Sequence, residues 1–456
     1  MAPSNTTPLV GKAKASPTKA FFVRMLTRDI SLDDCILDLV DNSIDGAWKT
    51  SGHHPDSFVV NKDLSKFTID IQFSPDQFQI ADNCGGITLD DAANYAFTFG
   101  RTEKQPDVDY SVGVYGIGMK RAVFKLGGEI TVRSTYREGR KLTGFQVPIN
   151  VKAWLEKEGS DWDFDIEELE AAAAPGVDII IDALSDETQN RFNDPAYERN
   201  LLRVLSRDYL VPLMRGLVIR VNGTKVETTY LQLLEDEQFV PMRDTYSDGD
   251  VKVELIAGMR HRPPDSGEPE DGSSRADEVS GWYVICNGRV VLGADRSSNT
   301  GWGLNDFPMW HRQYSGFVGI AFFSSREPTL LPMTTTKRSV DVSSGVYRRA
   351  VPKMQVPTRA WIDYTNRRKT DQSVKQLETA ATPREISTIN PNPAVRLPSI
   401  APGPLGERVA NVLYTVPYKR LRRLAAAFGQ RNMSYKDVGQ KAFDYAYEML
   451  VDEDET

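Results

Sequence analysis

The segment LDLVDNSIDGA contains two carboxylates and one amide whose spacing would place them on the same side of a helix. Asp38, Asn42 and Asp45 are separated by four and then three residues, so their side chains share one face of a helix. Apolar residues occupy the opposite face, which we expect to pack on a sheet. Such a helix can support polar chemistry, but these three residues alone are more typical of a solvated helix surface.

A second motif, IADNCGGI, places Asp82 at the end of an apolar strand and follows it with glycines. The glycines permit a tight turn that opens a helix. A buried carboxylate at the end of a strand can accept a hydrogen bond from a ligand amine, for which N6 of adenine is a natural candidate. By itself, this motif is more typical of an ordinary strand-to-helix turn.

The third motif, GVYGIGMK, is a G-x-x-G-x-G pattern that opens a helix. Backbone N–H groups at a helix N-terminus bind phosphate, and glycines let the phosphate approach closely. The dinucleotide pattern has its glycines in the reverse order and the P-loop pattern is absent, so neither of those folds is supported. The candidate phosphate-binding residues are Gly113, Tyr115, Gly116, Ile117, Gly118, Met119 and Lys120.

Hydrophobic periodicity predicts the elements that must position these motifs. A strong amphipathic helix is expected from Ser31 to about Thr50, with Ser31 and Asp34 forming a capping box in its weaker Asp form. Further helices are predicted over 89–97, 119–125 and 198–213, and strands over 67–71, 77–81, 177–181, 217–221, 282–286 and 290–292.

Bulk composition limits the class of protein. The 456 residues suffice for two or three domains, and a net charge of -8 argues against a surface covered with nucleic acid, although it allows a local basic surface. Three scattered cysteines and four histidines exclude a disulfide framework and a zinc site. No apolar run reaches the roughly 20 residues that cross a bilayer, and the N-terminus lacks a secretory signal. We therefore expect a soluble cytoplasmic protein with no membrane partner.

In combination, the three motifs resemble the N box, G1 box and G2 box of the GHKL ATPases, the superfamily of gyrase B, Hsp90, MutL, the MORC proteins and histidine kinases. Their form is most similar to MutL-like, MORC-like and bacterial Hsp90-like ATP-binding proteins. The resemblance implies an α+β fold. In it, a Bergerat-type ATPase domain with helices layered on a mixed, mostly antiparallel sheet precedes an S5-like α/β transducer domain and a small helical C-terminal region.

The resemblance also implies ATP and Mg²⁺ as cofactors and assigns roles to residues. The N-box Asn that holds Mg²⁺ is Asn42, and the acidic residue that orients or deprotonates the attacking water is Asp38. Asp82 reads adenine, and Gly86 keeps the floor of the pocket open. The transducer lysine that reaches the γ-phosphate is Lys337, in the segment TTTK. Further contacts are expected from Asp45, from Lys120 and from the glycines Gly113, Gly116 and Gly118, which end an ATP lid over about 97–112.

Three positions depart from the family pattern. Asp38 stands where the family usually has Glu, and its side chain is one methylene shorter. A misplacement of about an ångström can lower a rate on the order of 10²-fold. Cys84 replaces the first G1 glycine, and Val177 replaces a Thr that helps to bind adenine in many members. These departures lower the expected rate of hydrolysis rather than the expected binding of Mg-ATP.

The domain organisation is predicted from composition and from the resemblance. We expect a flexible arm over 1–20, the ATP-binding domain over 21–185, the transducer over 186–350, a helical connector over 351–382, a proline-rich linker over 383–406 and a helical region over 407–456.

The leading hypothesis is an ATPase that acts as a nucleotide-driven switch, pairs as a homodimer through its ATPase domains and works in a DNA-associated or defence-type system. The alternative is a nucleotide-gated scaffold that scarcely hydrolyses ATP, motivated by Asp38. A histidine kinase is disfavoured because no His precedes the N box, and the chain lacks the long later domains of an Hsp90 chaperone. Two basic clusters either bind DNA or a protein partner or form a solvated basic face, and the sequence favours neither interpretation. The clusters are Arg348, Arg349, Lys353, Arg359, Arg367, Arg368 and Lys369, and Lys419, Arg420, Arg422 and Arg423.

Overall fold

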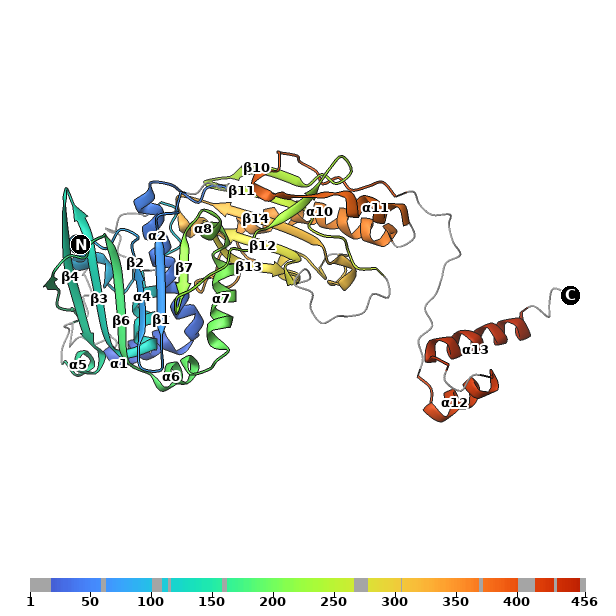
Figure 1. The fold of residues 1–456 in the computed structure, drawn as a ribbon, viewed down its shortest axis with the longest axis horizontal. Helices are drawn as coiled ribbons and strands as arrows, with labels where there is room; N and C mark the ends of the chain where they lie inside the picture. The colour runs from blue at the N-terminus through green and yellow to red at the C-terminus, as the bar shows by residue number, and fades with distance from the viewer. Residues whose placement is uncertain are drawn as a thin grey trace, which may run out of the picture. The chain divides into compact units, whose positions relative to one another are not determined.

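Two large sheets and one two-stranded sheet lie in the larger of two units, Met1–Ile400, and a pair of helices forms the smaller one, Ala401–Thr456 (Figure 1). The computed structural model describes residues 18–58, 63–100, 109–113, 116–157, 162–265, 278–304, 306–368, 372–400, 415–429 and 433–451. Tyr115, Lys369, residues 101–108 of the expected lid and residues 1–17 of the expected arm lie outside these ranges.

The first sheet has eight strands in the order β5-β4-β3-β6-β2-β1-β7-β8. Every neighbouring pair is antiparallel except β1 and β7, which are parallel. The predicted mixed, mostly antiparallel sheet is therefore confirmed. Its strands are β1 Thr68–Phe73, β2 Phe78–Asp82, β3 Gly127–Glu138, β4 Lys141–Asn150, β5 Glu167–Leu169, β6 Gly176–Leu184, β7 Val218–Val221 and β8 Thr224–Lys225.

Helix α2, Leu32–Ser51, lies on this sheet and is the helix that the sequence predicts. Ser31 caps it by accepting a hydrogen bond from the backbone of Asp34 at 3.1 Å, and Gly52 ends it in the left-handed conformation. Its apolar face belongs to the core of the first domain. Helix α4, Gly118–Leu126, packs beside it, and α1, Lys19–Arg28, packs against α4. The domain also contains α3 Leu89–Asp91, the π-helix η1 Ala92–Ala96 and α5 Val151–Glu156, which packs on β3 and β4.

Helix α1 was not expected, because residues 1–20 were predicted to form a flexible arm. Thr18 caps the helix, and Lys19 is buried with its Nζ donating to the carbonyl of Trp154 at 3.0 Å. The same Nζ lies 4.8 Å from the centre of the Trp154 ring, so a cation–π contact adds to the hydrogen bond. The prediction is therefore wrong for residues 18–20.

The first domain extends further along the chain than residue 185. Helices α6 Asp186–Phe192 and α7 Tyr197–Asp208 pack into its core, and strand β7 pairs with β1. Val226 is the last residue of this core. The expected boundary between 185 and 186 is wrong because the segment LVIRVNG completes the first sheet instead of beginning the second domain.

The second sheet has five strands in the order β10-β11-β14-β12-β13, covered on both faces. Along β14, Phe317, Ala321 and Phe323 face a core shared with helix α10, whereas the alternate residues face α8 of the first domain. This alternation explains why every residue of β14 is buried. Helix α8 of the first domain spans Leu210–Met214. The elements of the second domain up to residue 368 include β10 Met242–Asp248, β11 Val251–Met259, β12 Gly281–Cys286, β13 Arg289–Asp295, η2 Ser298–Thr300, η3 Arg312–Tyr314, β14 Phe317–Ser324, η4 Pro328–Leu330 and α10 Gly345–Arg368.

The predicted connector and most of the predicted linker are parts of this second domain. Met354 and Trp361 of α10 are buried against its sheet, and α11, Gln372–Ala380, follows. Strand β15, Thr382–Glu385, pairs with β9, Gln232–Glu235, and leads into η5, Ile386–Thr388. The proline content predicted a linker over 383–406, but Ile386, Ile389 and Ile400 are buried and fix residues 383–400 to the domain. Residues 401–406 lie outside the described ranges.

Several members of the first predicted basic cluster make contacts within the second domain. Arg349 is paired with Asp248 at 2.7 Å, and Arg368 is buried against Glu378 and Asp265. Lys353 and Arg359 lie over the rings of Tyr246 and Phe307 at 4.5 and 4.0 Å. Among the described members of the cluster only Arg368 is buried, and the other five remain exposed, so these contacts do not remove a basic surface there.

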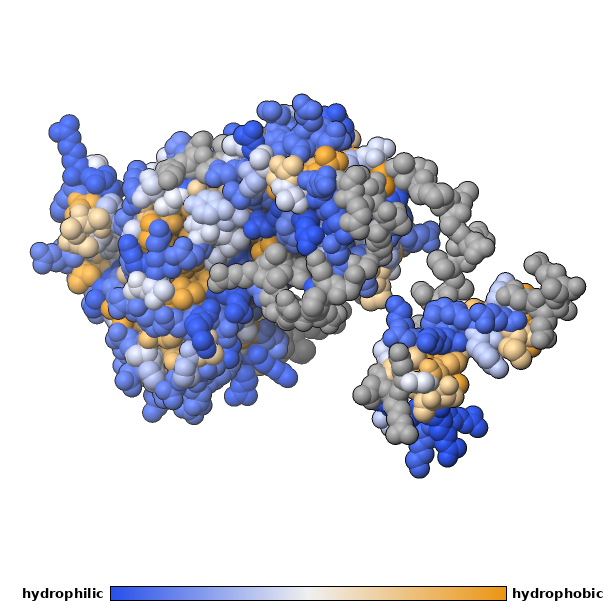
Figure 2. Space-filling view, turned by 45° about the vertical axis from the view of Figure 1, so that its right-hand side comes forward, coloured by the Kyte–Doolittle hydropathy of each residue, from blue (hydrophilic) through white to orange (hydrophobic). Residues whose placement is uncertain are grey.

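The small C-terminal unit contains α12, Tyr418–Ala427, and α13, Tyr435–Leu450, which meet through Ala425, Met433 and Val438. Figure 2 shows apolar residues between hydrophilic ones on the face of this unit that is in view. Tyr445 and Tyr447 of α13 are more than half exposed. Across the described residues of the whole chain, no helix is long and apolar enough to span a membrane.

Candidate functional site

A cavity of about 500 Å³ opens between α2, the end of β2 and the start of α4, and a loop of the second domain reaches it. Its volume suits a small-molecule ligand. Every predicted site residue that the structure describes lines it: Asp38, Asn42, Asp45, Asp82, Gly86, Gly113, Gly116, Ile117, Gly118, Met119, Lys120 and Lys337. The three motifs, separated by up to some 80 residues in the chain, thus converge on one site.

Asp82 forms the polar end of the cavity floor. Its Oδ2 accepts a hydrogen bond from Ser43 at 2.6 Å, and its Oδ1 accepts from the amides of Cys84 at 2.8 Å and Val177 at 3.2 Å. Burial raises the pKa of Asp82, and these hydrogen bonds oppose the rise. Three donors fix the carboxylate beside the cavity, where a ligand amine can still reach an oxygen lone pair. Ser43 was not among the predicted site residues, although it directly follows Asn42 in the first motif.

A close backbone approach requires glycine at position 86, and Gly118 makes a second close contact beside the cavity. Gly86 has a φ of +77°, and a Cβ there would lie 2.0 Å from the carbonyl oxygen of Thr135 on β3. At Gly118, a Cβ would lie 3.2 Å from Cγ of Asp38, so glycine lets the start of α4 approach α2. Ile117 precedes this helix and offers no side-chain cap, which leaves the first amides of α4 directed at the cavity.

Lys120 does not point at the cavity as a free cation. It is 4 % exposed, and its Nζ donates to the carbonyl of Ala96 at 3.0 Å and to that of Gly116. Burial lowers its pKa to about 8. In this conformation, Lys120 joins the π-helix to the glycine segment, so its predicted phosphate contact would require these hydrogen bonds to break.

Asp45 holds the beginning of the glycine motif. Its Oδ1 accepts from the amide of Val112 at 2.9 Å, and its Oδ2 accepts from the amide of Gly113 at 3.0 Å. Burial raises the pKa of Asp45 from 3.8 to about 7, and the two amide hydrogen bonds oppose the rise. Asp45 therefore positions the segment that borders the cavity.

The raised pKa of Asp45 predicts a dependence of stability on pH. Between about pH 4 and 7 the folded chain retains a proton on Asp45 that the unfolded chain loses, so the free energy of unfolding falls as the pH rises through this window. Asn cannot ionise, so Asp45→Asn should gain stability relative to the parent as the pH rises. Urea denaturation at about pH 4.5 and 8.5 measures this, and an equal difference at both values would contradict it.

Asn42 is exposed within an otherwise buried stretch of α2, because it faces the cavity. Its amide makes no hydrogen bond with the part of the chain that the structure describes. Asp38, one turn earlier, is 3 % exposed and is engaged at both oxygens. Its Oδ2 lies 2.7 Å from Nε of Arg121 on α4, and its Oδ1 lies 3.2 Å from Nζ of Lys337.

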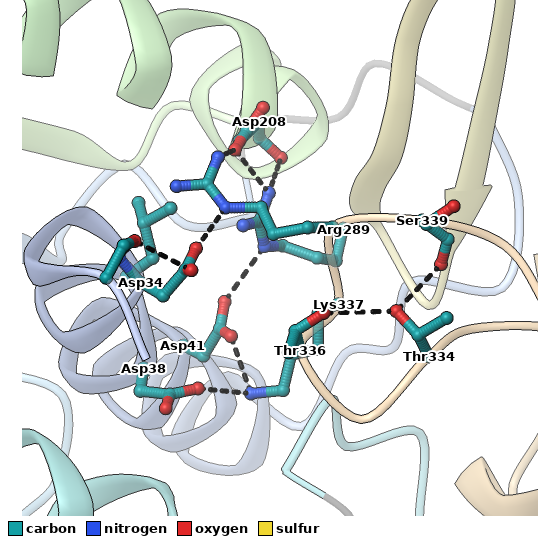
Figure 3. A network of polar contacts seen from close by, with 12 residues as sticks. Asp34, Asp38, Asp41, Asp208, Arg289, Thr334, Thr336, Lys337 and Ser339 are labelled. Atoms are coloured by element: carbon teal, nitrogen blue, oxygen red, sulfur yellow. Dashed lines mark hydrogen bonds and ion pairs between the residues drawn. The ribbon is translucent and has the colours of Figure 1, made fainter. Parts of the chain in front are cut away.

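Lys337 joins the second domain to this site (Figure 3). Its Nζ donates to Oδ2 of Asp41 at 2.7 Å as well as to Asp38, and its side chain is buried. Burial lowers the pKa of Lys337, but Asp41 and Asp38 outweigh burial and raise it. The residue has a φ of +57°, which is strained for a residue with a side chain, and such strain is often stored at functional positions.

Asp41 is the next member of a longer chain of charges. It accepts a hydrogen bond from Tyr209 at 2.8 Å and lies 3.2 Å from Nε of Arg289. Arg289 pairs in turn with Asp208 at 3.1 Å. Burial raises the pKa of Asp41, but Lys337 and Arg289 outweigh burial and hold it below its usual value. We call the whole set the ionic chain: Arg121, Asp38, Lys337, Asp41, Arg289, Asp208, Arg338 and Asp34.

The ionic chain alternates cations and carboxylates, and its members come from α2, α4, α7, β13 and the loop that carries Lys337 and Arg338. Of these residues, only Asp38 and Lys337 were predicted from the sequence to belong to the site. Lys337 and Asp41 are 296 positions apart, so no local pattern could pair them. The one available signal was Asp41 itself, a carboxylate on the apolar side of the helix, where an unpaired charge is costly.

Comparison with known families agrees with this geometry. Residues 30–170 match the model of the family described as histidine kinase-, DNA gyrase B-, and HSP90-like ATPase. This range contains α2, the Asp82 turn and the glycine motif, and it ends before the second domain. No curated protein matches the chain.

Proposed function

We propose that the protein is a slow Mg²⁺-dependent ATPase whose nucleotide state controls its second domain, because residues 30–170 match the model of the GHKL-like ATPases. One observation carries the proposal: Lys337 of the second domain enters the nucleotide cavity and rests on Asp38 and Asp41 of α2. A γ-phosphate in the cavity would compete with these carboxylates for the same ammonium group. Binding and hydrolysis would thereby move the loop that carries Lys337.

The residues beside the cavity fit Mg²⁺ as well as ATP. Mg²⁺ takes oxygen ligands and usually keeps water and substrate phosphates with only one or two protein groups. The exposed amide of Asn42 supplies one such oxygen, and the described residues hold no cluster of three or more acidic, His or Cys side chains that could bind a metal without the nucleotide. When bound, Mg²⁺ would neutralise charge on the phosphates.

Residues of the chain itself bind adenine and the phosphates and position the attacking water. Asp82 accepts from the exocyclic amine of adenine, and the first amides of α4 with the glycines hold the phosphates. Asp38 accepts a proton from the attacking water or orients it, once Lys337 has left its Oδ1. Arg121 stays on the other oxygen of Asp38 and keeps the carboxylate in place.

The alternative function, a nucleotide-gated scaffold, is favoured by one observation. Both oxygens of Asp38 are engaged by cations, so neither is free to accept a hydrogen bond from an attacking water unless one of these contacts breaks. GHKL ATPases often dimerise, and ATP-dependent pairing of two copies belongs to either proposal. Sedimentation velocity with a non-hydrolysable ATP analogue tests the pairing, which an unchanged sedimentation coefficient would contradict.

Asp82→Ala tests the proposed adenine contact. Loss of a hydrogen bond to a charged group costs about 1.5 to 3 kcal/mol, so we expect the affinity for ATP to fall about tenfold or more. The affinity for GTP, which presents a carbonyl in place of the amine, should change little. Asp178→Ala, which removes a carboxylate of the same sheet that does not line the cavity, is the matched control. Equal losses for ATP and GTP would contradict adenine recognition by Asp82.

A further inference from the structure

The segment 109–113, which leads into the glycine motif, is held by both domains. The first domain holds it through Asp45, which accepts from the amides of Val112 and Gly113. The second domain holds it at Tyr110, whose amide donates to the carbonyl of Arg326 at 3.2 Å. Ser111 and Gly113 both line the cavity, so the position of this segment sets part of the cavity wall.

Asn287 makes the innermost contact between the second domain and this segment. It occupies the turn between β12 and β13, has a φ of +44° and is 1 % exposed. Its Nδ2 donates to the carbonyl of Ser111 at 3.2 Å and to the carbonyl of Ser325 at 3.0 Å. Its Oδ1 accepts from the amide of Ser325 at 3.0 Å. One buried amide therefore ties the cavity segment to the end of β14.

We propose that Asn287 is a positioning residue of the nucleotide site, through which the second domain holds the cavity wall independently of Lys337. The proposal rests on the proposed ATP binding. The Ser111 carbonyl is fixed by the second domain, and the next two amides are fixed by Asp45, so the two contacts together place Gly113 at the cavity wall. Without the Asn287 amide, the carbonyls of Ser111 and Ser325 lose a buried donor, and the segment must shift or admit water to satisfy them.

The chain contains a matched control for this position. Asn222 also precedes a glycine in a turn between two strands, with a φ of +46°. Its Oδ1 accepts from the amide of Phe73 at 2.9 Å, and it does not line the cavity. Replacing either Asn by Gly preserves the left-handed turn and removes one amide, so a general effect of the substitution appears in both variants.

Hydrogen exchange without nucleotide tests the positioning directly. In Asn287→Gly, we expect the amides of Val112 and Gly113 to exchange about tenfold faster or more, because they open from Asp45 more often. Asn222→Gly should leave both amides unchanged. Asn287→Asp keeps the acceptor for Ser325 and tolerates the turn but donates nothing to Ser111, so it should resemble Asn287→Gly. Equal exchange in Asn287→Gly and Asn222→Gly would overturn the proposal.

Nucleotide binding provides the second measurement. Asn287→Gly should weaken Mg-ATP binding about fivefold or more while leaving kcat at saturating ATP within about twofold, because the residue places the cavity wall and touches no reacting group. Combined with Lys337→Met, the two losses of affinity should multiply, as for independent sites. If the double variant binds Mg-ATP as tightly as Lys337→Met alone, Asn287 does not act independently of Lys337. A parent protein that binds no ATP would refute the proposed function and leave the exchange result to be judged by itself.

Discussion

Lys337→Met is expected to lower ATP turnover by about a hundredfold or more, the usual loss when one preorganised donor to a transition state is removed. Met keeps the length of the side chain and removes its charge. Because the ammonium group would meet only the γ-phosphate, the affinity for ADP should be unaffected and the preference for ATP over ADP should shrink. Steady-state phosphate release and equilibrium binding of both nucleotides measure these quantities.

The same substitution should destabilise the protein without nucleotide. Lys337 lies between Asp38 and Asp41, and removing one member of a buried ion pair costs about 3 kcal/mol or more. Lys49→Met is the matched control, because Lys49 also lines the cavity but lies on the exposed end of α2 and pairs with neither carboxylate. If Lys49→Met reduces turnover as strongly as Lys337→Met, the proposed role of Lys337 at the γ-phosphate is contradicted.

Asp38→Asn is expected to reduce turnover by about 10² to 10⁴-fold, the range for loss of a general base. Asn keeps the shape of the side chain but cannot accept the proton. The affinity for Mg-ATP should stay equal or improve, because a negative charge near the phosphates disappears. Single-turnover phosphate release together with nucleotide binding separates the two effects.

Asp34→Asn is the control for Asp38→Asn. Asp34 lies one turn earlier on α2 and belongs to the ionic chain through Arg338, but it does not line the cavity. Its substitution should leave kcat within about threefold of the parent. Turnover that survives in Asp38→Asn would exclude Asp38 as the base. A parent that binds ATP and releases no phosphate would favour the nucleotide-gated scaffold.

Local sequence patterns predicted the parts of the site that are local. The cap at Ser31 and the spacing of Asp38, Asn42 and Asp45 define α2 and the face that it turns to the cavity. Asp82 sits at the strand end where the pattern placed it. These features depend on helical and strand periodicity, which acts over a few residues and is visible in the sequence.

The remaining features depend on contacts between distant segments. The ionic chain joins α2 to residues beyond position 200, and nothing in the spacing of Arg289 or Asp208 indicates a partner. Lys120 lines the cavity as its place after the glycines predicts, but its hydrogen bond to the carbonyl of Ala96, 24 positions earlier, has no local signal in the sequence. The linker prediction failed for a similar reason: it weighed the prolines, whereas three buried isoleucines decide where residues 383–400 pack.

Isothermal titration calorimetry of the full chain with Mg-ATP measures whether the cavity binds nucleotide at all. We expect saturable binding at one site per chain, weaker when Mg²⁺ is chelated and weaker for GTP than for ATP. Absence of binding at millimolar nucleotide, or equal binding of ATP and GTP without any need for Mg²⁺, would contradict it.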